Sequence, residues 1–71
     1  MMYLKVYKKG VMVQDWREYK HDISAALTKI SGNADKVINC INELSSKGEA
    51  ILEGINPNSL ESFKIELKKQ V

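Results

Sequence analysis

The side chains best suited to covalent or metal chemistry are a single cysteine and a single histidine. Cys40 and His21 are the only residues of their types among the 71, so neither an intramolecular disulfide nor a Cys/His zinc site can be assembled. Nucleophilic catalysis by such a pair needs a third group that orients the histidine, and the sequence offers none that is recognisable. We expect Cys40 to pack as a small hydrophobe. The sequence therefore predicts no catalytic residue, no metal, no cofactor and no small-molecule substrate.

Residues 33–47 carry side chains of another kind, which can hydrogen-bond to nucleic acid. Apolar residues recur at helical spacing here, Asn33 or Ser31 can cap the start, and Gly48 follows the end. The apolar positions are Ala34, Val37, Ile38, Ile41 and Leu44. We predict a helix with Ile41 and Leu44 in the core.

The polar face of this helix combines basic, amide and acidic side chains. It holds Asp35, Lys36, Asn39, Glu43, Ser46 and Lys47. Asn39 can pair with adenine, while Lys36 and Lys47 can contact phosphate or guanine. The alternative is an ordinary solvated surface, because Glu43 and Lys47 form a favourable i,i+4 pair and acidic residues repel DNA.

The first half of the chain allows two interpretations. Residues 2–8 alternate in the manner of a strand, which Gly10 interrupts. From Val13 to Ile30 the apolar period fits a helix, so we predict one over residues 14–31, with a break near Asp22, which can cap a second segment. The alternative pairs residues 11–16 with the first strand as a hairpin around Lys9 and Gly10.

The last part of the chain is typical of a hairpin. Residues 49–55 are strand-like, and the Asn56-Pro57-Asn58-Ser59 stretch has the composition of a turn. Residues 61–69 alternate apolar and charged side chains, which favours a strand antiparallel to residues 49–55. A helix is the other possibility for this segment, but it would expose Ile65.

The predicted order β-α-α-β-β resembles the winged helix-turn-helix family without its first helix. The close Ser31-Gly32-Asn33 connection and the spacing of Leu44, Gly48 and Ile51 are similar to that family's passage from recognition helix to wing. The resemblance implies an α+β domain, residues 1–71, with a three-stranded antiparallel sheet. It also implies binding to double-stranded DNA as a transcriptional regulator. The implied contacts are Asn33, Lys36, Asn39, Lys47 and Asn58.

A homodimer is the second expectation. The stripe of Trp16, Tyr19 and Ile23 would lack a covering helix, next to Tyr3 and Tyr7, and such a patch favours a symmetric partner. The alternative is that the first strand folds back over the stripe and closes the core within one chain. The alternative function is a small homodimeric interaction module, an adaptor or inhibitor that binds no nucleic acid. With 11 basic and 9 acidic residues, the net charge of +2 permits a nucleic-acid partner without requiring one. The lysines near the start argue against a secretory signal, and no apolar run suits a membrane span, so we expect a cytoplasmic protein.

Overall fold

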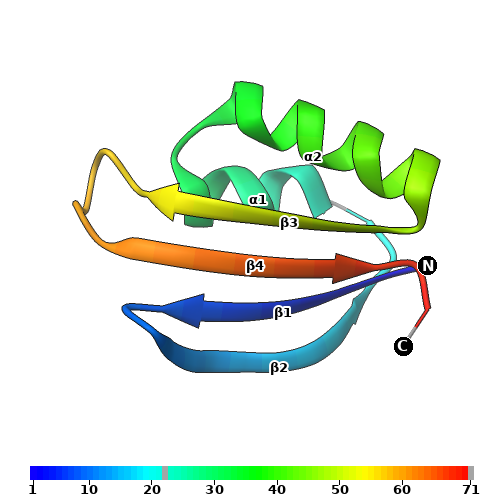
Figure 1. Ribbon diagram of the computed structural model, residues 1–71, viewed down its shortest axis with the longest axis horizontal. Helices are drawn as coiled ribbons and strands as arrows, with labels where there is room; N and C mark the ends of the chain where they lie inside the picture. The colour runs from blue at the N-terminus through cyan, green and yellow to red at the C-terminus, as the bar shows by residue number, and fades with distance from the viewer. Residues whose placement is uncertain (22, 71) are drawn as a thin grey trace.

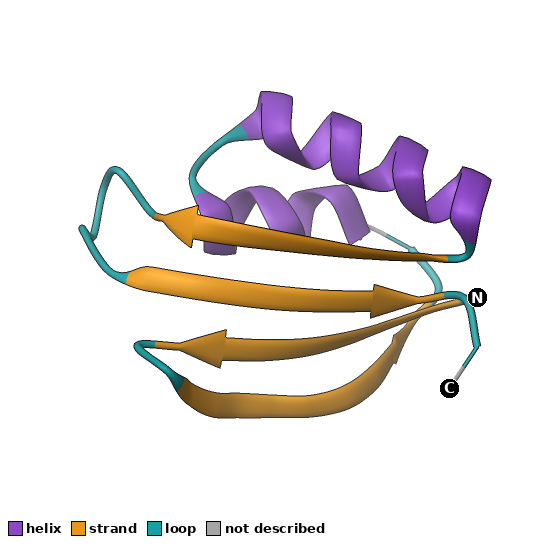
Figure 2. Cartoon of the chain, in the orientation of Figure 1, coloured by secondary structure: helices purple, strands orange, loops and turns teal. Residues whose placement is uncertain are grey.

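The chain folds as two hairpins joined by two helices. A computed structural model describes residues 1–21 and 23–70. The elements are β1 (Met2–Lys8), β2 (Val11–Tyr19), α1 (Ile23–Ser31), α2 (Ala34–Lys47), β3 (Glu49–Ile55) and β4 (Ser62–Lys68). The predicted α+β class is confirmed. Figure 1 shows α1 behind the sheet and α2 along its β3 side, and Figure 2 shows the same layers by element type.

The helix predicted over residues 14–31 is wrong in its first part, and the hairpin alternative is correct. Residues up to Tyr19 form β2, which pairs antiparallel with β1. Lys9 and Gly10 both have positive φ, 53° and 78°, as a tight hairpin turn requires. The segment is rich in β-branched and aromatic residues, which favour a strand, and its pairing partner lies immediately before it in the chain. The expected break at Asp22 lies outside the described residues.

This correction changes the sheet from three strands to four. The strand order is β2-β1-β4-β3, with every neighbouring pair antiparallel. The predicted pairing of the last two strands is confirmed, with Leu52 opposite Ile65. The chain order is therefore β-β-α-α-β-β rather than the β-α-α-β-β expected from the sequence.

The hydrophobic core lies between the helices and one face of the sheet. Alternate residues of β1, β3 and β4 point into it and meet α1 and α2. Its buried members are Leu4, Val6, Leu27, Val37, Cys40, Leu44, Ala50, Leu52, Phe63, Ile65 and Leu67. Leu44 is fully buried as predicted, whereas Ile41 is only partly buried against this cluster.

The ends of α2 are fixed by the residues predicted to cap it. The Asn33 side chain accepts a hydrogen bond from the Lys36 backbone N–H at 3.2 Å. Gly48 adopts a left-handed conformation, and its N–H donates to the Leu44 carbonyl at 2.9 Å. The predicted turn between β3 and β4 is also present, and Asn56 Nδ2 donates to the Ile30 carbonyl at 2.9 Å. That contact holds the turn against the end of α1.

Candidate nucleic-acid interface

The face of the sheet opposite the helices carries aromatic and basic side chains from three strands. Side chains alternate across a strand, so the neighbours of the buried residues in β1 and β4 point to this second face. We call it the open face. Its central side chains are Tyr3, Lys5 and Tyr7 from β1, Trp16 from β2, and Lys64, Glu66 and Lys68 from β4.

Two aromatic rings on the open face each have two ammonium groups near them. Lys5 Nζ lies 5.8 Å from the centre of the Trp16 ring and 5.6 Å from that of Tyr7. Lys68 Nζ lies 5.1 Å from the Trp16 ring, and Lys64 Nζ lies 6.0 Å from the Tyr7 ring. These distances allow cation–π attraction between the lysines and the rings. Lys5 is shared by both rings and so lies at the centre of the arrangement.

Lys5 keeps its positive charge throughout the physiological pH range. Interaction with the Tyr7 side chain raises the pKa of Lys5 above its ordinary value; desolvation acts against this, and attraction from Asp15 and Glu66 adds to it. A raised amine pKa means that the ammonium form persists to higher pH than usual. The central group of the open face is therefore a cation at neutral pH.

The charge on the open face is unevenly distributed. The lysines lie over β1 and β4, where Lys5 is opposite Glu66 and Tyr7 is opposite Lys64. Carboxylates also occur at the two margins, with Glu18 on β2 and Glu49 and Glu53 on β3. Three lysines against one carboxylate, Glu66, leave the middle of the sheet basic, so a polyanion would be attracted there and repelled from the β3 margin.

The residues predicted to bind DNA lie on the helical side and do not form one cluster. Lys36 and Asn39 are exposed on α2, and Lys47 is exposed near its end, where it pairs with Glu43 at 3.6 Å. Lys36 and Lys47 are separated by roughly 16 Å along a helix that rises 1.5 Å per residue. The side-chain oxygen of Asn33 is engaged in capping α2. Asn58 is exposed in the β3–β4 turn, where its backbone N–H donates to Asn56 Oδ1. Contact of these five residues with DNA stays a prediction.

The residues predicted to form a dimer interface divide between the two faces of the sheet. Tyr3, Tyr7 and Trp16 are half-buried and belong to the open face. Tyr19 and Ile23 instead pack against the core. The single stripe inferred from the sequence depended on a helix over residues 14–31, which does not form. Dimerisation stays a prediction, and the aromatic residues of the open face are what could support it.

The sequence interpretation missed the partnership between Trp16 and the three lysines. The alternation of residues 61–69 predicts one charged side for that strand, but the sequence places Trp16 on a helical stripe. Its position beside Lys5 follows only from the hairpin pairing of β1 and β2. The Lys9-Gly10 pair, a two-residue turn directly after the first strand, was the signal that could have revealed it.

The two residues considered for covalent chemistry are in different environments. Cys40 is buried in the core, and that burial raises the pKa of its thiol. His21 is exposed beyond the end of β2. Within residues 1–21 and 23–70, no group of three or more His, Cys, Asp or Glu side chains is placed to hold a metal ion. Neither described helix has the length and apolar character needed to cross a membrane.

No protein family, curated protein or solved structure matches this chain in the comparisons with known proteins.

Proposed function

We propose that this chain is a nucleic-acid-binding module that holds a single strand, rather than a duplex, on the open face of its sheet. The observation that carries the proposal is the pair of rings, Trp16 and Tyr7, with Lys5 between them and Lys64 and Lys68 on the outer sides. Aromatic platforms combined with backbone-tracking cations are the general means by which proteins bind unpaired strands.

In the proposed complex one base stacks on Trp16 and the next stacks on Tyr7. The phosphate that links them then lies near Lys5, which is within 6 Å of both ring centres. Lys64 and Lys68 swing from the rings toward the flanking phosphates, because their long side chains are flexible. Stacking contributes about 1–3 kcal/mol per base and tolerates any base, so the predicted preference is for unpaired strands rather than for one sequence.

The first experiment is a fluorescence-anisotropy titration with labelled RNA and DNA octamers of mixed sequence. Trp16→Leu keeps apolar bulk on the sheet but removes the large stacking surface, so we expect affinity to fall about tenfold. Val13→Ala, an exposed position on the same strand, is the matched control and should leave affinity within twofold. Equal affinity of the parent protein and the Trp16 variant would refute the proposed site.

A second experiment measures how binding depends on salt. Three phosphate contacts on a single strand predict a slope of about −2 in a plot of log affinity against log salt concentration. Lys64→Gln and Lys68→Gln should each make this slope shallower by about 0.7. Lys29→Gln removes the same charge from α1, on the other side of the molecule, and should leave the slope unchanged.

Binding of duplex DNA by α2 is the second candidate. It is favoured by the exposure of Lys36 and Asn39 on the same helix. If this candidate is correct, Lys36→Ala weakens binding to all duplexes alike and lowers the salt slope by about one unit. Asn39→Ala then costs about 1–3 kcal/mol of discrimination at one base pair. Trp16→Leu would have no effect on duplex binding, which separates the two candidates.

A further inference from the structure

The strand β3 forms one edge of the sheet. Its backbone is regular enough to hydrogen-bond to a further strand on its outer side. It is hydrogen-bonded on one side only, to β4, through seven consecutive residue pairs with no shift of register. The other edge strand, β2, has two register shifts in its pairing with β1. Bulges, prolines and lysines are among the devices that block an edge, and β3, all of whose residues are described, has none of them, although α2 runs along this side of the sheet (Figure 1).

The backbone groups that face this free edge can be assigned from the hydrogen bonds at its two ends. The Lys69 N–H donates to the Gly48 carbonyl at 3.0 Å, and the Asn56 N–H donates to the Glu61 carbonyl at 2.9 Å. Hydrogen-bonded pairs alternate along an antiparallel ladder, so the even-numbered residues of β3 bond to β4. The N–H and C=O groups of Glu49, Ile51, Glu53 and Ile55 therefore point away from the sheet.

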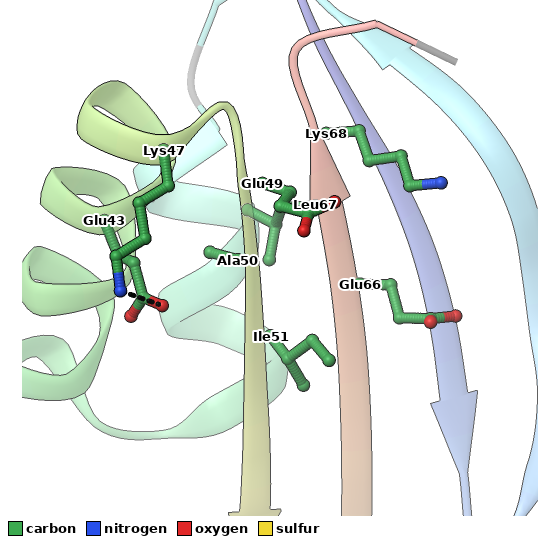
Figure 3. Close-up of a pocket in the computed structure, with 8 residues that line it drawn as sticks. All are labelled: Glu43, Lys47, Glu49, Ala50, Ile51, Glu66, Leu67 and Lys68. Atoms are coloured by element: carbon green, nitrogen blue, oxygen red, sulfur yellow. Dashed lines mark ion pairs between the residues drawn. The ribbon is translucent and has the colours of Figure 1, made fainter.

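The side chains of those four residues give the edge a definite chemistry. Two carboxylates alternate with two isoleucines, and Ile51 and Ile55 are 56% and 65% exposed. A groove of ≈ 420 Å³ follows the first half of the strand, and its lining includes Glu49, Ile51, the Glu43–Lys47 pair of α2, and Glu66 and Lys68 of β4. Figure 3 shows that pair on one side of β3 and Ile51 and Glu66 on the other. An added strand would thus meet acidic and aliphatic side chains in alternation.

We propose that β3 receives a cationic extended peptide from another protein as a fifth strand of the sheet. The backbone of the peptide bonds to the free groups of the four odd-numbered residues, as in other cases of strand addition. Lysine or arginine side chains of the peptide lie opposite Glu49 and Glu53, and an aliphatic side chain lies opposite Ile51. Glu49 and Glu53 lie opposite Lys68 and Lys64 of the open face. The backbone edge of β3 is nevertheless separate from the Trp16 and Tyr7 rings, so this proposal does not require the proposed nucleic-acid function.

A second copy of the chain fits this edge less well than a cationic peptide. Symmetric pairing of two β3 strands would place Glu49 and Glu53 of both copies along one short ladder. Four carboxylates would then share an edge with no compensating lysine from either β3 strand. Like charges directly opposite each other destabilise the pairing, as in the register that places Glu49 of one copy opposite Glu53 of the other, whereas opposite charges stabilise it.

The test uses a labelled nine-residue peptide. Its centre has lysine, valine and lysine at every second position, and threonine occupies the positions between them. We expect saturable binding by anisotropy, at least tenfold tighter than that of a peptide with glutamate in place of each lysine. Methylating the backbone nitrogens of the lysine and valine residues should weaken binding at least tenfold. Methylating those of the threonines, which face away from β3, should change it by less than twofold. Equal effects of the two methylation patterns would overturn strand addition.

Charge reversal on the protein tests which edge is used. The double variant Glu49→Lys and Glu53→Lys should lose affinity for the lysine peptide at least tenfold and gain affinity for the glutamate peptide. Glu18→Lys makes the same change on β2, the opposite edge, and should leave both affinities within twofold. An unchanged preference in the double variant, or absence of binding by the parent protein, would refute the proposal. A dimer that forms through β3 and excludes the peptide would refute it as well.

Discussion

The connection between the two helices packs closely against the β3–β4 turn, and adding a single methyl group at Gly32 should disrupt this contact. Gly32 has a φ of +68°, and a Cβ built there would lie 2.8 Å from Asn56 Oδ1 and 2.9 Å from Pro57 Cδ. Asn56 cannot move freely to make room. Its Oδ1 accepts the N–H groups of Asn58 at 2.8 Å and Ser59 at 3.3 Å, and its Nδ2 donates to the Ile30 carbonyl at 2.9 Å. We therefore predict that Gly32→Ala is strongly destabilising.

The size of the effect follows from two contributions. A left-handed conformation costs a non-glycine residue about 1–2 kcal/mol, partly offset by about 0.4–1 kcal/mol from a less flexible unfolded chain. Displacing Asn56 also removes three hydrogen bonds, each worth about 1 kcal/mol. Gly48→Ala is the matched control, because Gly48 has a φ of +82° but nothing within 4 Å of its Cβ position. We expect Gly32→Ala to cost about 2–3 kcal/mol more than Gly48→Ala.

Urea unfolding followed by circular dichroism measures the difference. With a slope near 1 kcal/mol/M for a small domain, the midpoint of Gly32→Ala should lie about 2–3 M below that of Gly48→Ala. In an Asn56→Ala background, the extra cost of the Gly32 substitution should largely disappear, because both changes break the same contacts. Equal midpoints for the two glycine variants would show that the turn is not held against the helices in this way.

Three further outcomes are expected. Leu44→Ala should lower the free energy of unfolding by about 2–5 kcal/mol in urea, because Leu44 is fully buried. The same change at Ile38, which is 58% exposed, should cost under about 1 kcal/mol. Equal losses at the two positions would contradict the packing of α2. Cys40 should react slowly with a thiol reagent at pH 8 until urea unfolds the chain, because the thiol is buried and its pKa is raised; rapid reaction of the folded protein would show an accessible site. If the predicted homodimer forms through the open face, a folded Trp16→Ser variant should sediment as a monomer. A parent protein that is itself monomeric at micromolar concentration would refute the dimer.

The second half of the fold could be predicted because its local signals agree with each other. Asn33 and Gly48 bound one helix, and the strict alternation of residues 62–68 indicates a strand with one buried face. The turn at residues 56–59 joins two strands of matching length. Each of these signals is read from neighbouring residues, so no distant contact is needed to interpret it.

The first half could not be assigned in the same way because its apolar residues fit two periods. Trp16, Tyr19 and Ile23 lie on a helical stripe in the sequence, but β2 ends at Tyr19 and α1 begins at Ile23. The register shifts in the β1–β2 pairing also interrupt the alternation that would have identified β2. Pairing with β1 determines that this segment is a strand. Burial of its apolar side chains does not, because the valines and the methionine of β2 are exposed.

The same ambiguity limited prediction of the candidate site. The polar face of α2 was recognisable from its spacing, because one helix presents it. The open face combines β1, β2 and β4, which are separated by up to about sixty residues in the chain, and its composition depends on strand order and register. Lys68 lies over Trp16 only because β4 pairs with β1 and β1 with β2.

Mapping of nucleic-acid contacts by NMR tests the central claim most directly. The protein labelled with ¹⁵N is titrated with an unstructured RNA octamer, and its backbone amides and the Trp16 indole N–H are followed. The proposed function predicts that the largest shifts occur at the Trp16 indole and at the amides around Lys5, Tyr7 and Lys64, while α2 stays unchanged. Shifts confined to Lys36, Asn39 and their neighbours on α2, or no shifts at low salt, would contradict the proposal that the open face binds single strands.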